Sequence, residues 1–218
     1  IMTNLFNIFD PSTSMWNNLQ FNWTSSMFII MLIPNSIWII PNRIFMIYFK
    51  LMLNLNNEML MLYKNKNFKS PSFMFIILFM FIFMNNLLSL FPYIFSSSSH
   101  MIFSLSIALP FWLFFIIMSI LMNTKNFIIH LIPLNTPILL APLMAIIETM
   151  SIFIRPLSLA IRLTANLIAG HLLMTLLNFN SMMLIILMIQ IMLMLFELCV
   201  ALIQSYVFSM LSSLYSSE

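Results

Sequence analysis

The chain has 218 residues, of which 62% are hydrophobic and only 6% are charged. This balance lies far from that of soluble globular domains and therefore excludes a soluble fold. The net charge of +3 does not describe a nucleic-acid surface, because five of the eight Lys and Arg residues are confined to one local cluster at residues 43–69.

The apolar runs indicate helices that cross a membrane. A bilayer core needs roughly 20 apolar residues per helical crossing, and several runs reach that length, whereas barrel strands are segments of about 10 residues with alternating character. We therefore expect an all-α polytopic membrane protein, forming a single membrane domain over residues 1–218, with about five membrane-embedded helices and one amphipathic surface helix. The first 22 residues contain Asp10 and no Lys or Arg, which argues against a cleavable targeting segment.

The first two predicted elements differ in character. Residues 23–40 are an apolar run interrupted at Pro34, and we predict a first crossing there. Within residues 43–64, the polar side chains fall in one sector of a helical wheel, and Ile, Phe, Met and Leu occupy most of the remaining positions. This pattern is typical of an amphipathic helix that lies on the membrane surface, although a soluble packing helix would look similar. The sector consists of Arg43, Lys50, Asn54, Asn57, Glu58 and Lys64.

The next elements form a predicted helical hairpin. Residues 73–95 make a second crossing that carries Asn85 and Asn86, and residues 101–122 make a third crossing that contains Pro110. The loops that carry Lys and Arg then lie on one face, which the positive-inside rule assigns to the matrix or cytoplasm. The N-terminus is expected on the opposite face.

The last two runs, residues 137–177 and 182–214, are unusually long. A helix of 41 residues would be about 61 Å long, twice the thickness of the bilayer core. It would have to lie steeply inclined or break at Pro142 or Pro156. We expect two steeply tilted antiparallel helices.

Ionisable residues inside this long pair are the candidate functional residues. Glu148, Arg155 and Arg162 are spaced by seven and share a helix face, which Ser158, Ala165, Asn166 and Ala169 extend. His171 lies about 180° around the helix from Arg162, so its expected partner is Glu197 on the last helix. On a purely structural interpretation, these residues are ion pairs that fix the hairpin.

The side-chain chemistry separates the roles of these residues. Glu and His exchange protons, whereas the guanidinium of Arg162 stays charged. A fixed cation that faces a small, smooth surface can hold a carboxylate of another subunit ionised and block direct proton passage. A leak would dissipate about 2.3 kcal/mol per proton at 100 mV. The sequence therefore indicates two proton-access paths separated by Arg162.

Other residues of this region have weaker assignments. Gly170, the only glycine, permits close approach of a neighbouring helix, either beside the site or as a plain packing contact. Gln204 lies seven residues after Glu197 and could bond to Asn166 or Arg162. Asn85 and Asn86 could line a wet path, but a helix-to-helix hydrogen bond is the preferred interpretation. His100 and His130 lie apart from carboxylates, and Cys199 is the single cysteine, so we assign no metal and no cofactor.

At these residues the chain resembles subunit a, or subunit 6, of F-type ATP synthases, in particular the mitochondrially encoded insect form. The resemblance covers nearly the whole chain. One departure is the segment Leu134-Asn135-Thr136-Pro137, which lacks a glycine that similar chains often have. The motifs that carry it are IIET at 146–149, IRP at 154–156, LAIRLTANLIAGH at 159–171 and IQSYVF at 203–208, with FDPSTS at 9–14, FPY at 91–93 and LYSSE at 214–218.

The resemblance implies a role for each candidate residue. Arg162 would be the stator arginine that faces the ring of c subunits, with Asn166 and Gln204 near the rotor and Gly170, Ala165 and Ala169 packing toward it. His171 and Glu197 would belong to the half-channel of the intermembrane space, and Glu148 to that of the matrix. The implied setting is the mitochondrial inner membrane, with the C-terminus toward the matrix, other membrane-sector subunits as partners, and ATP chemistry on other chains.

Two alternatives stay open at this point. A proton-coupled transporter or a proton-pumping respiratory subunit would work without a rotor. Inverted repeats would favour the transporter, and the sequence shows none. A non-conducting scaffold predicts that neutralising Arg162 leaves the proton flux intact.

Overall fold

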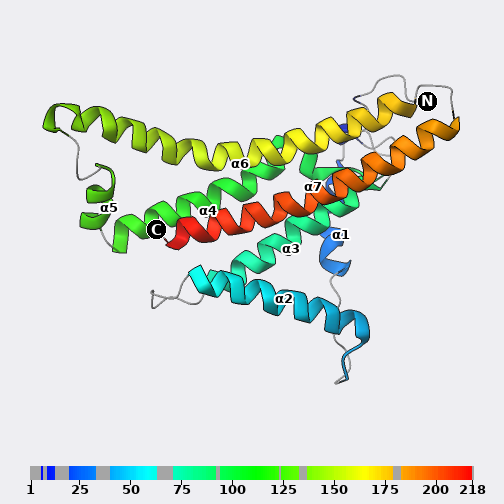
Figure 1. The fold of residues 1–218 in the computed structure, drawn as a ribbon, viewed down its shortest axis with the longest axis horizontal. Coiled ribbons are helices and arrows are strands. Elements are labelled where there is room, and N and C mark those ends of the chain that lie inside the picture. Colours follow the sequence, from blue (N-terminus) through cyan, green and yellow to red (C-terminus); the bar gives the residue numbers. More distant parts are fainter. Residues whose placement is uncertain are drawn as a thin grey trace. The chain divides into compact units, whose positions relative to one another are not determined.

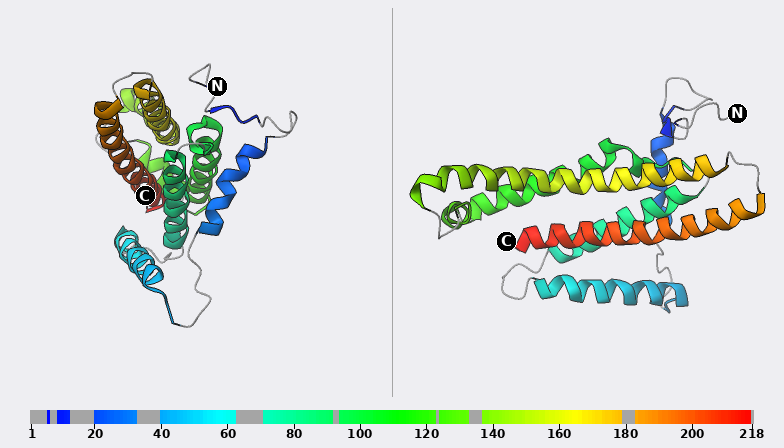
Figure 2. Two further views of the ribbon diagram at one scale, coloured as in Figure 1. Left: turned by 90° about the vertical axis from the view of Figure 1, so that its right-hand side faces the viewer. Right: turned by 45° about the horizontal axis from the view of Figure 1, so that its top comes forward.

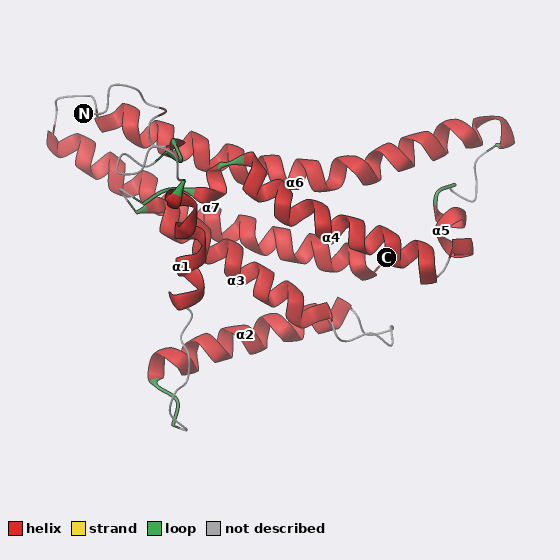
Figure 3. Ribbon diagram, turned by 180° about the vertical axis from the view of Figure 1, so that it is seen from behind, coloured by secondary structure: helices red, strands yellow, loops and turns green. Residues whose placement is uncertain are grey.

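The computed structural model describes residues 6, 9–12, 20–32, 40–62, 71–91, 94–122, 124–132, 137–178 and 183–217. These residues are almost entirely helical, and Figure 3 shows no strand among them. The predicted all-α class is therefore confirmed. The α-helices are α1 (Ser25–Leu32), α2 (Arg43–Leu62), α3 (Pro71–Leu90), α4 (Met101–Met122), α5 (Thr124–His130), α6 (Ala141–Asn178) and α7 (Met183–Ser217), and the 3-10 turns are η2 (Phe21–Thr24), η3 (Ser97–Ser99) and η4 (Ile138–Leu140).

Four of these helices are long and apolar enough to cross a membrane, which confirms a multi-pass membrane protein. The predicted first crossing at residues 23–40 begins with η2 and α1, and its remainder at 33–39 lies outside the described residues. The four candidate spans are Ser72–Leu90, Met101–Leu121, Ala141–Leu177 and Ile186–Leu214.

The two long C-terminal helices are continuous, as Figure 1 shows. α6 has 38 residues and runs through Pro156 without a break. At 1.5 Å per residue it is about 57 Å long. The predicted break at Pro156 is therefore wrong, whereas the run expected from residue 137 does change from a 3-10 turn to the α-helix at Ala141, next to Pro142. The inclination to a bilayer stays a prediction.

The chain divides into two compact units, one formed by Ile1–His100 with Ala165–Glu218 and the other by Met101–Thr164. In the first unit, α3 packs most extensively against α7. The face of α3 that becomes buried repeats every three or four residues, as expected for a helix that buries one stripe. This stripe consists of Phe75, Phe79, Ile82, Asn86 and Ser89.

The buried part of α7 is rich in serine. Ser205, Ser209 and Ser213 have no exposed surface. Each hydroxyl donates to the carbonyl three residues earlier, at distances of 2.8, 2.9 and 2.8 Å. The serines are thus small and internally hydrogen-bonded, which lets a neighbouring helix approach closely without leaving a buried polar group unpaired.

α2 has the amphipathic character that the sequence predicts. Met59 is buried, whereas Arg43 and Lys50 are exposed. α2 packs beside α3, as Figures 1 and 2 show, and it also contacts α7. The contact with α7 includes a hydrogen bond of 3.0 Å from the Tyr206 hydroxyl to Glu58 Oε2.

The second unit holds α4, α5 and the first part of α6. α5 is a helix of seven residues that the sequence pattern does not predict. Seven residues make only about two turns, too few for a periodic pattern to stand out.

Candidate functional site

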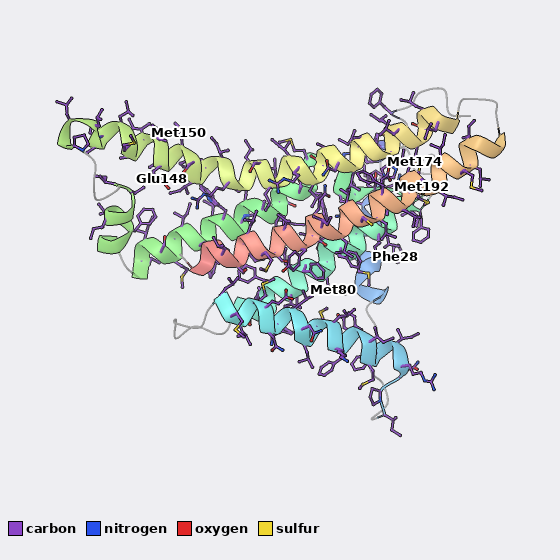
Figure 4. All side chains as sticks on the ribbon, in the orientation of Figure 1. Phe28, Met80, Glu148, Met150, Met174 and Met192 are labelled. Carbon is purple, nitrogen blue, oxygen red and sulfur yellow. The ribbon has the colours of Figure 1, made fainter. Side chains whose placement is uncertain are left out.

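The candidate residues lie on α6 and α7. In the second unit, α6 carries Glu148, which Figure 4 labels, together with Arg155 and Arg162. In the first unit, the remainder of α6 carries the small and polar candidates, and α7 carries the rest. These first-unit residues are Ala165, Asn166, Ala169, Gly170 and His171 on α6 and Glu197 and Gln204 on α7.

Glu148 and Arg155 form an ion pair along α6. Arg155 Nη2 lies 4.0 Å from Glu148 Oε1, and the two side chains are 34% and 42% exposed. An exposed pair at this distance contributes little to stability. Because both residues belong to one helix, the pair does not join α6 to α7, so it does not serve as the hairpin-fixing ion pair of the structural interpretation.

The helix face around Arg162 is exposed. Arg162, Ala165, Asn166 and Ala169 are all exposed, whereas Leu163 and the other residues on the opposite side of the same turns are buried. Of these exposed side chains, those of Ala165 and Ala169 are small, whereas Ile161, the residue before Arg162, is large and 42% exposed. In an apolar helix, a charged and small-residue surface of this kind indicates contact with a further protein surface rather than with lipid. The buried residues opposite are Ala160, Leu163, Thr164, Leu167 and Gly170.

Gly170 on α6 faces the end of the Glu197 side chain on α7. A Cβ atom at position 170 would lie 2.6 Å from Glu197 Cδ and 3.1 Å from its Oε2. The missing side chain of glycine therefore makes the space in which the Glu197 carboxyl group lies. Gly170 thus faces a titratable side chain of α7, and its predicted role in helix packing stays a prediction.

His171, the next residue, has a different surrounding. Its ring meets Phe9 edge to face, with the ring centroids 6.1 Å apart. His171 Nε2 and Glu197 Oε1 are buried, and neither atom has a hydrogen-bond partner among the described residues. A direct His171–Glu197 contact stays a prediction.

Gln204 lies on α7 two turns beyond Glu197 and is 8% exposed. It is therefore a buried amide on a membrane-spanning helix, as expected for a residue that faces protein rather than lipid. Its predicted hydrogen bond to Asn166 or Arg162 stays a prediction.

The two asparagines of α3 differ, although the sequence offers no signal that separates them. Asn85 Nδ2 donates to Phe81 O at 2.9 Å, and its Oδ1 accepts from Ser97 Oγ at 3.3 Å. Asn86 is fully buried, and both atoms of its amide lack a partner among the described residues. Asn85 thus bonds to its own helix and to η3, and the predicted helix-to-helix hydrogen bond of the two asparagines stays a prediction.

Comparison with known proteins gives a consistent result. Residues 19–217 match the family model described as ATP synthase A chain. The chain is 72% identical over 216 residues to the ATP synthase F(0) complex subunit a of Rhopalosiphum padi, with 99% of each chain covered. It is 46% identical to the ATP synthase subunit a of Locusta migratoria and 45% identical to that of Drosophila melanogaster, in each case over 100% of this chain and 99% of the relative.

Proposed function

The chain belongs to the ATP synthase A chain family, the subunits a of the F(0) complex, and on this premise we propose that it is the proton-translocating stator subunit of an F-type ATP synthase. It provides two half-channels, one on each side of a fixed arginine, that couple proton flow to rotation of a c-subunit ring. ATP chemistry takes place on other chains, since the sequence contains no glycine-rich phosphate loop.

The exposed face at the centre of α6 is the observation that carries this proposal. Arg162 stands there among the exposed small residues Ala165, Asn166 and Ala169. A permanent cation on a membrane-spanning helix faces protein or water rather than lipid, and it attracts carboxylates. A carboxylate on the c-subunit ring passes this cation as the ring turns, and the small residues that follow it on the helix let the ring slide past without interlocking.

The titratable groups lie on both sides of this cation along one continuous helix. Glu148 precedes Arg162 by about 21 Å along the axis, and His171 follows it by about 13 Å. Protons enter from the intermembrane space at His171 and Glu197 and load a c-ring carboxylate. They travel with the ring and leave past Glu148. Arg162 prevents the direct step between the two paths.

The membrane setting follows from the same assignment. The protein lies in the mitochondrial inner membrane, with its N-terminus toward the intermembrane space and its C-terminus toward the matrix. Arg43 and Lys50, both exposed on α2, then lie on the matrix side, as the positive-inside rule requires. A cysteine introduced at Asn42 in a Cys199→Ser background should react with an impermeant thiol reagent only after the inner membrane is opened.

The proposal is tested by proton-driven ATP synthesis and passive proton flux in membranes that carry Arg162→Ala at the same level of assembly as the wild type. We expect synthesis to be lost and the flux to change, because the barrier between the half-channels is removed. Arg43→Ala is the matched control, since it removes an exposed arginine at the start of α2. Unchanged coupling in Arg162→Ala would instead favour a scaffold.

A further inference from the structure

Pro156 leaves one carbonyl group of α6 without its usual donor. Proline has no backbone N–H, and within a helix this removes the hydrogen bond to the carbonyl four residues earlier, which here is that of Ile152. In the apolar interior of a membrane no water is at hand to replace it. α6 nevertheless continues through Pro156.

The missing donor comes from another helix. Trp112 on α4 directs its indole N–H at the carbonyl of Ile152, with 3.0 Å between Nε1 and the oxygen. The indole ring also packs on Phe153, with the ring centroids 5.0 Å apart and the planes inclined by 51°. Both helices belong to the same compact unit over these residues. Trp112 thus holds α6 at the residues just before the proline by one polar and one apolar contact.

Neighbouring side-chain bonds on α6 are of a different kind. Ser151 Oγ donates to the carbonyl of Glu148 at 2.7 Å, and Ser158 Oγ donates to that of Arg155 at 2.9 Å. These bonds stay within α6 and cannot set its position against a neighbour. The bond from Trp112 joins two helices, so it restrains the position of this part of α6 against α4.

We propose that Trp112 is a positioning residue for proton release, because it replaces the donor missing at Pro156 and thereby sets the orientation of Glu148. Ile152 lies one helical turn after Glu148, so a rotation of the helix at Ile152 moves that carboxyl group directly. The inference rests on the proposed role of Glu148 in the matrix half-channel. The hydrogen bond itself does not depend on that role.

The test is a double-mutant cycle on the assembled complex. Trp112→Phe keeps an aromatic ring but has no N–H, and Pro156→Ala returns a backbone N–H to Ile152. We expect Trp112→Phe alone to lower proton-driven ATP synthesis about fivefold, the factor of one net hydrogen bond, and to change its dependence on matrix pH. In the Pro156→Ala background, Trp112→Phe should cause neither change. Equal losses in both backgrounds would reduce Trp112 to a packing residue and overturn the proposal.

Two controls make the cycle specific. Pro110→Ala restores an N–H inside α4, two residues from Trp112, and should not rescue Trp112→Phe because it does not serve Ile152. If Pro156→Ala does not assemble, Trp112→Phe is compared with Trp23→Phe, since Trp23 makes ring contacts with Phe95 and His100. Equal pH profiles for these two variants would contradict the proposal.

Two measurements separate this inference from the proposed function. Thermal dissociation of the wild type, the two single variants and the double variant of the cycle reports the hydrogen bond whether or not Glu148 conducts protons. If the two substitutions are non-additive in thermal dissociation but additive in their effects on ATP synthesis, the positioning role is overturned. Glu148→Gln tests the half-channel separately, and normal synthesis in that variant would remove Glu148 from the proposed function.

Discussion

The carboxyl group of Glu197 on α7 occupies the space that a side chain at Gly170 on α6 would fill, since a Cβ atom there would lie 2.6 Å from Glu197 Cδ. The glycine therefore sets the position of a titratable group. The close approach involves the end of a flexible side chain rather than backbone, so Glu197 can yield without unfolding the hairpin.

Gly170→Ala is expected to displace the Glu197 carboxyl group and leave assembly intact. A shift of this size in a proton-transferring group should lower proton-driven ATP synthesis by about tenfold or more. The rate is measured at matched amounts of assembled complex. Glu197→Asp shortens the side chain by one methylene and should partly restore the rate in the Gly170→Ala background. A normal rate in the single variant would show that the position of Glu197 does not matter.

Asn85→Leu and Asn86→Leu are expected to differ in stability, although the two residues are adjacent on α3. Asn85→Leu removes two hydrogen bonds and leaves Ser97 Oγ without its acceptor, at a cost of about 1–2 kcal/mol. Asn86→Leu removes a buried amide that has no partner among the described residues, so it should be neutral or stabilising. Thermal dissociation of the complex compares them, and equal costs would contradict the difference seen between the two amides.

The sequence predicts the helices well because each bilayer crossing needs a long apolar run. The ends of the helices are less predictable. The crossing expected at residues 73–95 ends at Leu90 in the structure. The residue before a proline is disfavoured in the α conformation, so Phe91, which precedes Pro92, lies beyond the last helical residue.

Contacts between distant residues are what the sequence does not reveal. Pro156 suggested a break in α6, but a proline pattern contains no information about an indole 44 positions earlier that replaces the missing donor. The single glycine indicated a close helix approach without naming Glu197 as its neighbour. Ionisable groups are rare in apolar helices, so the sequence predicts the candidate residues. The contact partners of these residues depend on the packing of the folded chain.

The serine face of α7 gives a prediction about packing. Ser209 is fully buried, and its hydroxyl bonds to the carbonyl of Tyr206 in its own helix at 2.9 Å. Ser209→Ala should therefore change stability by less than about 1 kcal/mol, because no bond to another helix is lost. Ser209→Leu should cost about 1–3 kcal/mol by overpacking the contact with α3. Thermal dissociation distinguishes the two, and an Ala variant as unstable as the Leu variant would argue against close packing as the reason for the serines.

The hydrogen bond from Tyr206 to Glu58 gives a prediction about α2. The bond spans 148 residues of sequence at 3.0 Å, but it is exposed, so Tyr206→Phe should cost the whole complex less than about 1 kcal/mol. The local effect should be larger, because amphipathic α2 has a single fully buried residue, Met59. Loss of the hydrogen bond to α7 therefore increases the local unfolding of α2. We therefore expect faster amide exchange in α2 near Glu58 and unchanged exchange in α3.

Glu58→Gln keeps an acceptor for the Tyr206 hydroxyl, whereas Glu58→Leu does not. The exchange rate in α2 should consequently rise little in the Gln variant and as much in the Leu variant as in Tyr206→Phe. The double variant Tyr206→Phe with Glu58→Leu should then add nothing to either single change, because the two side chains contribute through the same bond. Additive effects would mean that each residue holds α2 through other contacts.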